Sequence, residues 1–135
     1  MTAPQAARAL LPALALAVVG LSAGCSSGSS TASAASTDKA PFHLSDQPAK
    51  TDHVDLPKSY KFLPPVVEVK QGTAVTWTNR DDFPHTVEIL AGADAGTHDL
   101  GIGKTVTITF DRVGTVYYRC SLHPTQMKGE VVVAP

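Results

Sequence analysis

Apolar and polar residues alternate in several short runs along the second half of the chain. In the run 106–110 (VTITF), Val106, Ile108 and Phe110 are separated by threonines, which places them on one face of a strand. Similar runs, separated by Gly, Pro, Asn and Asp, cover residues 66–69, 74–78, 86–90, 115–120 and 130–133. No run beyond residue 24 has helical periodicity. The pattern predicts an all-β domain, a sandwich or small barrel.

The first 50 residues have a different pattern. Residues 10–21 form an apolar run behind Arg8 that is shorter than the roughly 20 residues needed to cross a bilayer, and it is typical of a signal-peptide core. Residues 22–25 (SAGC) resemble the lipobox of bacterial lipoproteins, in which cleavage precedes a Cys that carries the lipid. A plain secretory signal is the alternative, and both readings send the chain across the membrane.

We therefore expect three parts along the chain. Residues 1–24 would be a lipoprotein-type signal peptide, and residues 25–50 would hold the lipid on Cys25 and a flexible tether rich in Ser and Ala. Residues 51–135 would form the folded domain. This domain is expected in the periplasm or at the outer face of the cell membrane, anchored to the membrane through lipid at Cys25.

The cysteine content bears on the chemistry of that compartment. With Cys25 lipidated or removed, the exported domain holds only Cys120 and cannot form an internal disulfide. A lone thiol in an oxidising compartment is open to intermolecular pairing and to oxidation. Binding to a metal ion would remove that reactivity, so the compartment favours a ligand role for Cys120.

The segment 120–127 (CSLHPTQM) concentrates side chains that bind soft metal ions. Cys120 and Met127 are the only Cys and the only Met beyond residue 25, and His123 lies between them. Taken singly, a Cys or a Met is more often core filler. Together with a second His, they form the ligand set of an electron-transfer copper centre, and the candidate for that His is His85.

Alternation also predicts where the thiol points. In the run 116–120, Val116, Tyr118 and Cys120 share one face, and this apolar face must be the core. Cys120 is therefore expected at the end of a strand with its sulfur directed inward. In a Greek-key sandwich, the strand containing Trp77 can end at the same pole and deliver His85 there.

Two motifs together resemble the cupredoxins, and within them the amicyanin and plastocyanin group. The first is Asn79, a short spacer and then Pro84-His85 before a strand, and the second is Cys-x-x-His with a following Met and a Gly-led last strand. The resemblance implies a Greek-key β-sandwich of about eight strands. It also implies one-electron transfer by a mononuclear type 1 (blue) copper site. The copper ligands implied by the match are His85, Cys120, His123 and Met127.

The chain departs from these relatives beside the site. Three residues separate His123 from Met127, a spacing intermediate between those of plastocyanins and amicyanins. Thr86 stands where Asn often follows the first His ligand, so the hydrogen bonds that brace the Cys loop must be made differently. We expect these differences to affect the redox potential more than copper binding.

The ligand set also implies a route for electrons. His123, in the loop, is expected to be the exit, because His85 at a strand entry should be the more buried of the two. An apolar patch around His123 would dock redox proteins. Its expected members are Phe83, Pro84, Leu122, His123 and Pro124, and the alternative is that they only cap the core.

The remaining features argue against other functions. A formal net charge of −1 gives no case for binding nucleic acid. The chain has no His-x-His pair for a multinuclear oxygen-reducing centre and no nucleophile constellation, so an enzyme is not expected. His98 is expected at the surface, as the one outside candidate for a ligand. Asp81 and Asp82 are expected in a solvated turn, with half of an acidic recognition patch as the alternative. We expect a monomeric electron carrier, with copper delivery or storage for an oxidase as the alternative.

Overall fold

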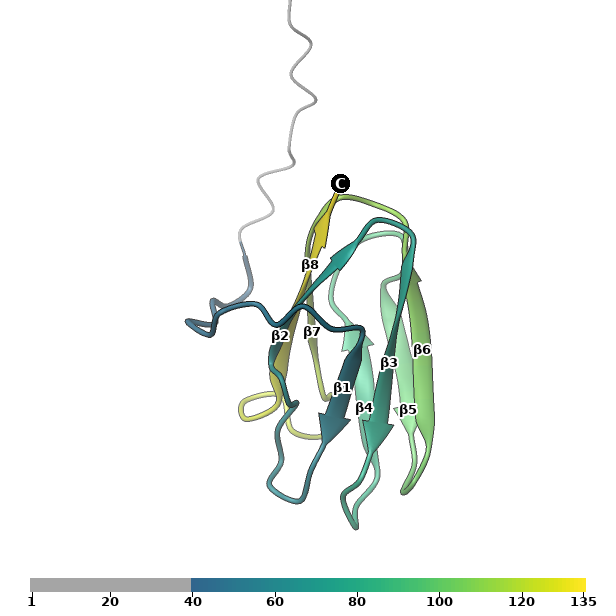
Figure 1. The fold of residues 1–135 in the computed structure, drawn as a ribbon. Coiled ribbons are helices and arrows are strands. Elements are labelled where there is room, and N and C mark those ends of the chain that lie inside the picture. The colour runs from purple at the N-terminus through teal and green to yellow at the C-terminus, as the bar shows by residue number, and fades with distance from the viewer. Residues whose placement is uncertain (1–39) are drawn as a thin grey trace, which may run out of the picture. The chain divides into compact units, whose positions relative to one another are not determined.

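A computed structural model describes residues 40–135, and the predicted signal peptide, Cys25 and most of the predicted tether lie outside this range. The described residues form eight strands in two facing sheets (Figure 1). Within them, no helix is long and apolar enough to cross a membrane. The strands are β1 (His53–Leu56), β2 (Val66–Lys70), β3 (Thr73–Asn79), β4 (His85–Ile89), β5 (Gly96–Leu100), β6 (Thr105–Phe110), β7 (Gly114–Arg119) and β8 (Lys128–Ala134). The predicted all-β sandwich is confirmed.

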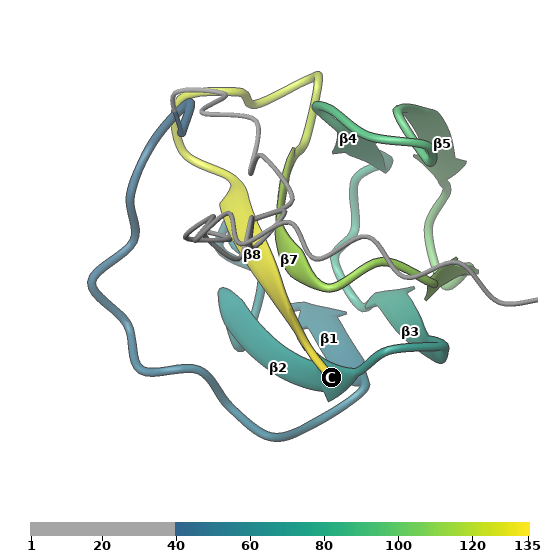
Figure 2. The same cartoon turned by 90° about the horizontal axis from the view of Figure 1, so that it is seen from above.

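The two sheets differ in size, and several connections cross from one sheet to the other. The smaller sheet has the order β1-β3-β6, and the larger has the order β2-β8-β7-β4-β5. β1 pairs with β3, and β2 with β8, in parallel, whereas the other neighbours are antiparallel. Seen from above, β1 and β3 lie in one layer and β7 and β4 in the other (Figure 2). Consecutive strands such as β3 and β4 therefore belong to opposite sheets.

Alternation decides which side chains enter the core between the sheets. In β3, Val75, Trp77 and Asn79 are buried, and the residues between them are more exposed. The ring of Trp77 contacts that of Tyr118 edge-on, with centroids 5.2 Å apart, and Tyr118 contacts Phe62 at 4.8 Å. Tyr118 and Cys120 are fully buried, as the alternation in 116–120 predicted.

The ring of Tyr118 lies directly over the backbone of Gly129 in β8. A Cβ atom at Gly129 would lie 2.2 Å from the Cζ atom of Tyr118, far inside normal contact distance. Because Tyr118 stands two residues before Cys120, this close approach helps to hold the end of β7 against the start of β8. Gly129 is therefore required by packing.

Residues 42–49, assigned to the tether by the sequence analysis, run along the larger sheet. Ala49 forms a parallel bridge with Val67, through hydrogen bonds from Ala49 N to Val66 O (3.0 Å) and from Glu68 N to Ala49 O (2.8 Å). The ring of Phe42 meets that of Tyr117 edge-on at 5.4 Å. The described fold therefore includes contacts made upstream of residue 51.

One end of the sandwich collects the loops that carry the predicted ligands. β1 and β3 end there and β4 begins there, at the lower end of Figure 1. Backbone hydrogen bonds from Arg80 N to Leu56 O and from Asn79 N to Lys104 O, both 2.9 Å, tie the ends of β1 and β3 to the start of β6. The same end receives the loop between β7 and β8, which we call the 120–127 loop.

Candidate metal centre

The 120–127 loop is closed on itself by backbone hydrogen bonds. Cys120 N donates to Met127 O at 3.0 Å, which continues the pairing of β7 with β8 across the base of the loop. Inside it, His123 N donates to Cys120 O (3.2 Å) and Met127 N donates to His123 O (2.9 Å). These tight turns bring the side chains of Cys120 and His123 to the same side of the loop.

Asn79 fixes the segment that leads to the second histidine. Its Nδ2 donates to Phe83 O (2.8 Å) and Leu100 O (3.0 Å), and its Oδ1 accepts from Asp81 N (2.8 Å). Asn79 is itself buried, so these bonds satisfy a polar side chain that would otherwise be costly to bury. They hold residues 80–84 in one conformation, and His85 enters β4 from there.

The structure brings His85, Cys120 and His123 together, and one ligand atom from each lies within 4.8 Å of the other two. The sulfur of Cys120 is 3.8 Å from Nδ1 of His85 and 3.7 Å from Nδ1 of His123. With bonds of about 2.3 Å to sulfur and about 2.0–2.1 Å to nitrogen, as in zinc sites, donor atoms this far apart could all reach one ion placed between them. Two imidazoles and a thiol so arranged fit one copper ion.

A buried carboxylate orients His85. Nε2 of His85 lies 3.1 Å from Oδ2 of Asp81, and both side chains are almost fully buried. An ionised carboxylate only accepts, so Nε2 carries the proton and Nδ1 presents its lone pair toward Cys120. The hydrogen bond with His85 is also the main cause that lowers the pKa of Asp81. The expectation of a solvated turn was therefore wrong for Asp81, whereas Asp82 is exposed and paired with Lys58 at 2.5 Å.

Thr86 braces the start of the 120–127 loop. Its backbone N–H donates to the sulfur of Cys120 at 3.4 Å, and its Oγ1 lies 3.7 Å from the same sulfur. Oγ1 also accepts from Ser121 N at 2.8 Å and lies 2.9 Å from Ser121 Oγ. One residue of β4 therefore holds both the thiol and the first residue of the loop behind it.

The two histidines differ in exposure as predicted. The side chain of His85 is fully buried, whereas His123 is half-buried at the loop surface. The two rings meet with centroids 5.3 Å apart. His123 is therefore the ligand candidate closer to solvent.

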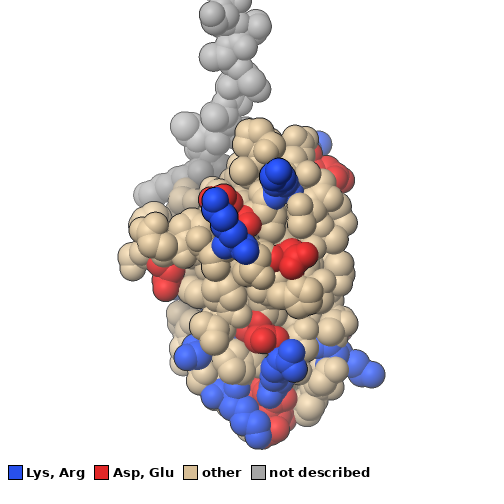
Figure 3. All heavy atoms as spheres, in the orientation of Figure 1, with Lys and Arg blue, Asp and Glu red and all other residues tan. Residues whose placement is uncertain are grey.

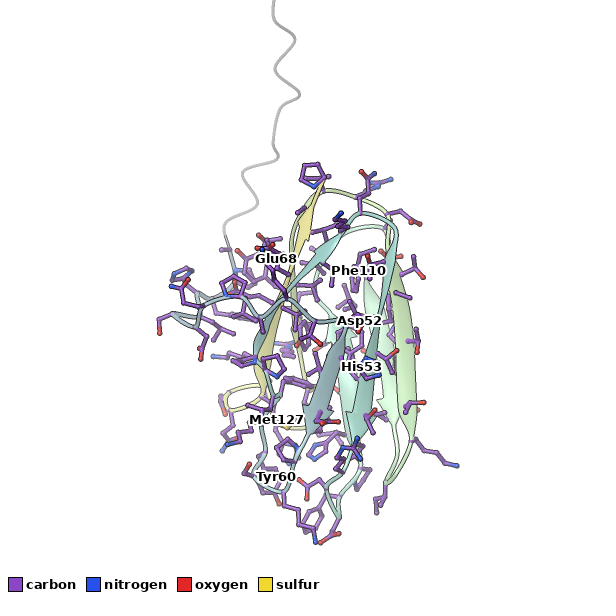
Figure 4. All side chains as sticks on the ribbon, in the orientation of Figure 1. Asp52, His53, Tyr60, Glu68, Phe110 and Met127 are labelled. Carbon is purple, nitrogen blue, oxygen red and sulfur yellow. The ribbon has the colours of Figure 1, made fainter. Side chains whose placement is uncertain are left out.

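Tyr60 completes the surface around His123 and was not identified from the sequence. Its ring meets that of His123 edge-on at 4.7 Å and stacks on Phe83 at 6.0 Å. Tyr60 adopts a left-handed backbone conformation (φ 52°), which turns the loop between β1 and β2 at this point. Figure 4 shows Tyr60 at the same end of the sandwich as Met127. No local spacing in the sequence could have placed Tyr60 beside residues so distant along the chain.

Apolar side chains around His123 are exposed. Tyr60, Phe83 and Leu122 are 40%, 53% and 55% exposed, and Pro84 and Pro124 are also exposed. On the face seen in Figure 3, positive and negative side chains are interspersed. The apolar surface formed by Tyr60, Phe83, Pro84, Leu122 and Pro124 is called the pole patch below.

Met127 and His98, the two other ligand candidates, lie in different surroundings. Met127 is fully buried in the same core cluster as Cys120, and its role as a ligand stays a prediction. His98 lies in β5, opposite Val87 of β4, and does not belong to the group of three. The structure thus favours His85 over His98 as the second histidine.

Comparisons with known proteins agree with this geometry. The model of the family described as copper binding proteins, plastocyanin/azurin family, matches residues 51–134. The chain is 38% identical over 94 residues to amicyanin-alpha of Methylorubrum extorquens, covering 67% of this chain and 77% of that protein. It is 39% identical over 83 residues to the chloroplastic plastocyanin of Tetradesmus obliquus, covering 53% and 57% respectively.

Solved structures point the same way. A purple cupredoxin from Nitrosopumilus maritimus superposes with a TM-score of 0.56 at 26% identity, over 61% of this chain and 98% of that one. The match of fold, the match of sequence and the convergence of the three donor atoms agree with one another. The chain belongs to the copper-binding proteins of the plastocyanin/azurin family.

Proposed function

We propose that the domain is a single-electron carrier in which His85, Cys120, His123 and Met127 hold one copper ion. The observation that carries the proposal is the convergence of two imidazole nitrogens on the sulfur of Cys120, at 3.7 and 3.8 Å. A copper ion bound there supplies a one-electron couple between Cu(I) and Cu(II). The relatives that support this function, amicyanins and plastocyanins, are electron carriers. All four proposed ligands can be used to bind the ion, and one-electron transfer needs no bound substrate.

Hydrogen bonds from residues outside the donor set hold two of the proposed ligands, His85 and Cys120, in place. His85 is fixed by Asp81, and Cys120 is fixed by its backbone bond to Met127 and by the N–H of Thr86. Side chains that are buried and hydrogen-bonded in this way have little freedom to rearrange when the charge of the centre changes. Small rearrangement favours fast electron exchange. Copper delivery would instead require the ligands to move apart and release the copper ion.

The proposal is tested by the absorption spectrum of the copper-loaded chain. An intense visible band is expected in the wild-type protein and should be lost in Cys120→Ser, because the band requires the thiolate. His98→Ala is the matched control and should keep the band, since His98 lies outside the group of three. A colourless protein that nevertheless binds copper would refute the carrier and favour copper delivery or storage.

We further infer that His123 is the exit for electrons and that redox partners dock on the pole patch. The support is the exposure of Phe83 and Leu122 and the contact of Tyr60 with the ring of His123. An exposed apolar surface beside the more accessible ligand lets a partner approach closely while excluding water. With interspersed charges and a formal net charge of −1, electrostatic steering would be local.

Electron self-exchange between two copies of the chain tests the docking surface without an identified partner. Leu122→Glu is expected to slow self-exchange by about tenfold or more, because two like charges would meet at the contact. Val113→Glu is the matched control, since Val113 is 54% exposed and lies between β6 and β7, away from the site. Equal slowing by both variants, or by neither, would contradict the assignment.

We also infer that the domain is exported and anchored through lipid on Cys25, which lies outside the described residues. The support is the apolar run 10–21 and the SAGC segment that follows it. Metabolic labelling with a radioactive fatty acid is expected to mark the wild-type chain and not Cys25→Ala. An unlabelled wild-type chain recovered in the soluble exported fraction would leave the plain secretory signal as the correct interpretation.

A further inference from the structure

The hydroxyl group of Thr86 lies between the sulfur of Cys120 and the start of the 120–127 loop. Oγ1 of Thr86 is 3.7 Å from Sγ of Cys120, 2.9 Å from Oγ of Ser121 and 2.8 Å from N of Ser121. Thr86 is buried, whereas Ser121 is exposed. The sulfur therefore has two possible donors from the same residue, the backbone N–H and the side-chain hydroxyl.

The number of protons that each group can donate limits how Thr86, Ser121 and the Cys120 sulfur pair. The N–H of Ser121 can only donate, so Oγ1 of Thr86 must accept from it. The hydroxyl of Thr86 has one proton left to give, either to Oγ of Ser121 or to the sulfur. Ser121 is exposed, so its own hydroxyl can donate to Thr86 and accept from water, whereas the buried sulfur has no access to water.

Charge favours the sulfur as the acceptor. A cysteine that binds a metal does so as the thiolate, and hydrogen bonds to an ionised acceptor are about twice as strong as neutral ones. The β-branched Thr side chain also has restricted χ1 freedom, which keeps the hydroxyl in place. The hydrogen-bond chain thus runs from Ser121 Oγ–H to Thr86 Oγ1, and from Thr86 Oγ1–H to the thiolate.

We propose that the Thr86 side chain is a positioning residue that raises the reduction potential of the centre by donating a second hydrogen bond to the Cys120 sulfur. This inference rests on the proposed function. The sulfur is more negative in the reduced protein, because it gives less electron density to Cu(I) than to Cu(II). A donor at the sulfur therefore stabilises the reduced form more than the oxidised form, and hydrogen bonding at this atom is known to tune such potentials.

Three variants of the copper-loaded full chain separate this role from simple packing. Thr86→Val keeps the shape and removes the hydroxyl, Thr86→Ser keeps the hydroxyl, and Ser121→Ala removes the side chain that orients it. At a fixed applied potential, Thr86→Val should shift the ratio of reduced to oxidised protein about tenfold toward oxidised, which is about 59 mV for one electron. Thr86→Ser should restore most of the shift, and Ser121→Ala should give a smaller shift in the same direction.

The position of the thiolate absorption band and the melting temperature of the metal-free chain are measured alongside. The band should move in Thr86→Val and return in Thr86→Ser, whereas a purely structural role would change the melting temperature and leave the potential alone. A wild-type potential in Thr86→Val, or a shifted potential in Thr86→Ser equal to that of the Val variant, would overturn the inference. Absence of a reversible one-electron couple in the wild-type chain would instead overturn the proposed function.

Discussion

The contact between Gly129 and Tyr118 yields a prediction whose size follows from the coordinates. In Gly129→Ala, the new Cβ would lie 2.2 Å from Cζ, 2.4 Å from Oη and 2.6 Å from Cε2 of Tyr118. Carbon atoms in contact normally lie about 3.5–4.0 Å apart, so the ring or the strand must move by more than about 1 Å. The ring cannot move freely, because Trp77 and Phe62 pack against it at 5.2 and 4.8 Å.

Overpacking of a core by about one methylene group destabilises proteins by about 1–3 kcal/mol. The overlap here is severe and the surroundings are closed, so we expect a loss of about 3 kcal/mol. For a domain of this size, that corresponds to a fall in melting temperature of roughly 12–24 °C. Thermal unfolding of the metal-free chain, followed by circular dichroism in the presence of a chelator, measures it.

Two comparisons identify the cause. Gly101→Ala is a matched control, since the nearest atom to its new Cβ would be Lys104 Cγ at an ordinary 3.5 Å, and its effect should stay within about 0.5 kcal/mol. In a Tyr118→Leu background, Gly129→Ala should lose most of its effect, because the two changes act on one contact. If Gly129→Ala melts with the wild type, or if its effect is the same with and without the Tyr118→Leu change, the packing argument is refuted.

Two further predictions concern the segment before His85. Asn79→Ala leaves Phe83 O, Leu100 O and Asp81 N without their partner and should destabilise the domain by about 3 kcal/mol in urea unfolding. Asn79→Asp should destabilise it at least as much, because it places a buried carboxylate oxygen against the two carbonyl oxygens. Loss of less than about 0.5 kcal/mol would contradict the role given to Asn79. Asp81→Asn should weaken copper binding about 10- to 100-fold in competition with a Cu(I) chelator, since the carboxylate sets the tautomer of His85. Asp82→Asn is its control, and equal affinities in both variants would show that Asp81 does not orient the ligand.

Periodicity predicted the strands that have one buried face. β3 and β6 alternate cleanly between core and solvent, and both were expected. β1 and β5 were not expected, because each is short and carries at most two apolar residues, Val54 and Leu56 in β1 and Leu100 alone in β5. In β5 (GTHDL) only Leu100 is buried, and its place in the sheet is decided by pairing with β4.

The candidate site was predictable where the proposed ligands lie in local motifs. Cys120 and His123 are three residues apart in one loop, and His85 follows Pro84 at the start of a strand, so residue chemistry alone indicated them. Asp81 was missed, because a carboxylate in a polar turn has the same local sequence whether it meets water or a histidine. Its position four residues before His85 is the signal that could have identified it.

The bridge between Ala49 and Val67 has a consequence for how the protein can be handled. β2 is an edge strand, and an uncovered edge offers its free N–H and C=O groups to any neighbouring chain, which promotes aggregation. Residues 48–50 occupy part of that edge and satisfy the backbone at Val66 and Glu68. A protein shortened to begin at residue 51, the boundary of the folded domain that the sequence predicts, would lack these residues. The edge of β2 would then be exposed, and otherwise native molecules would be expected to self-associate through it.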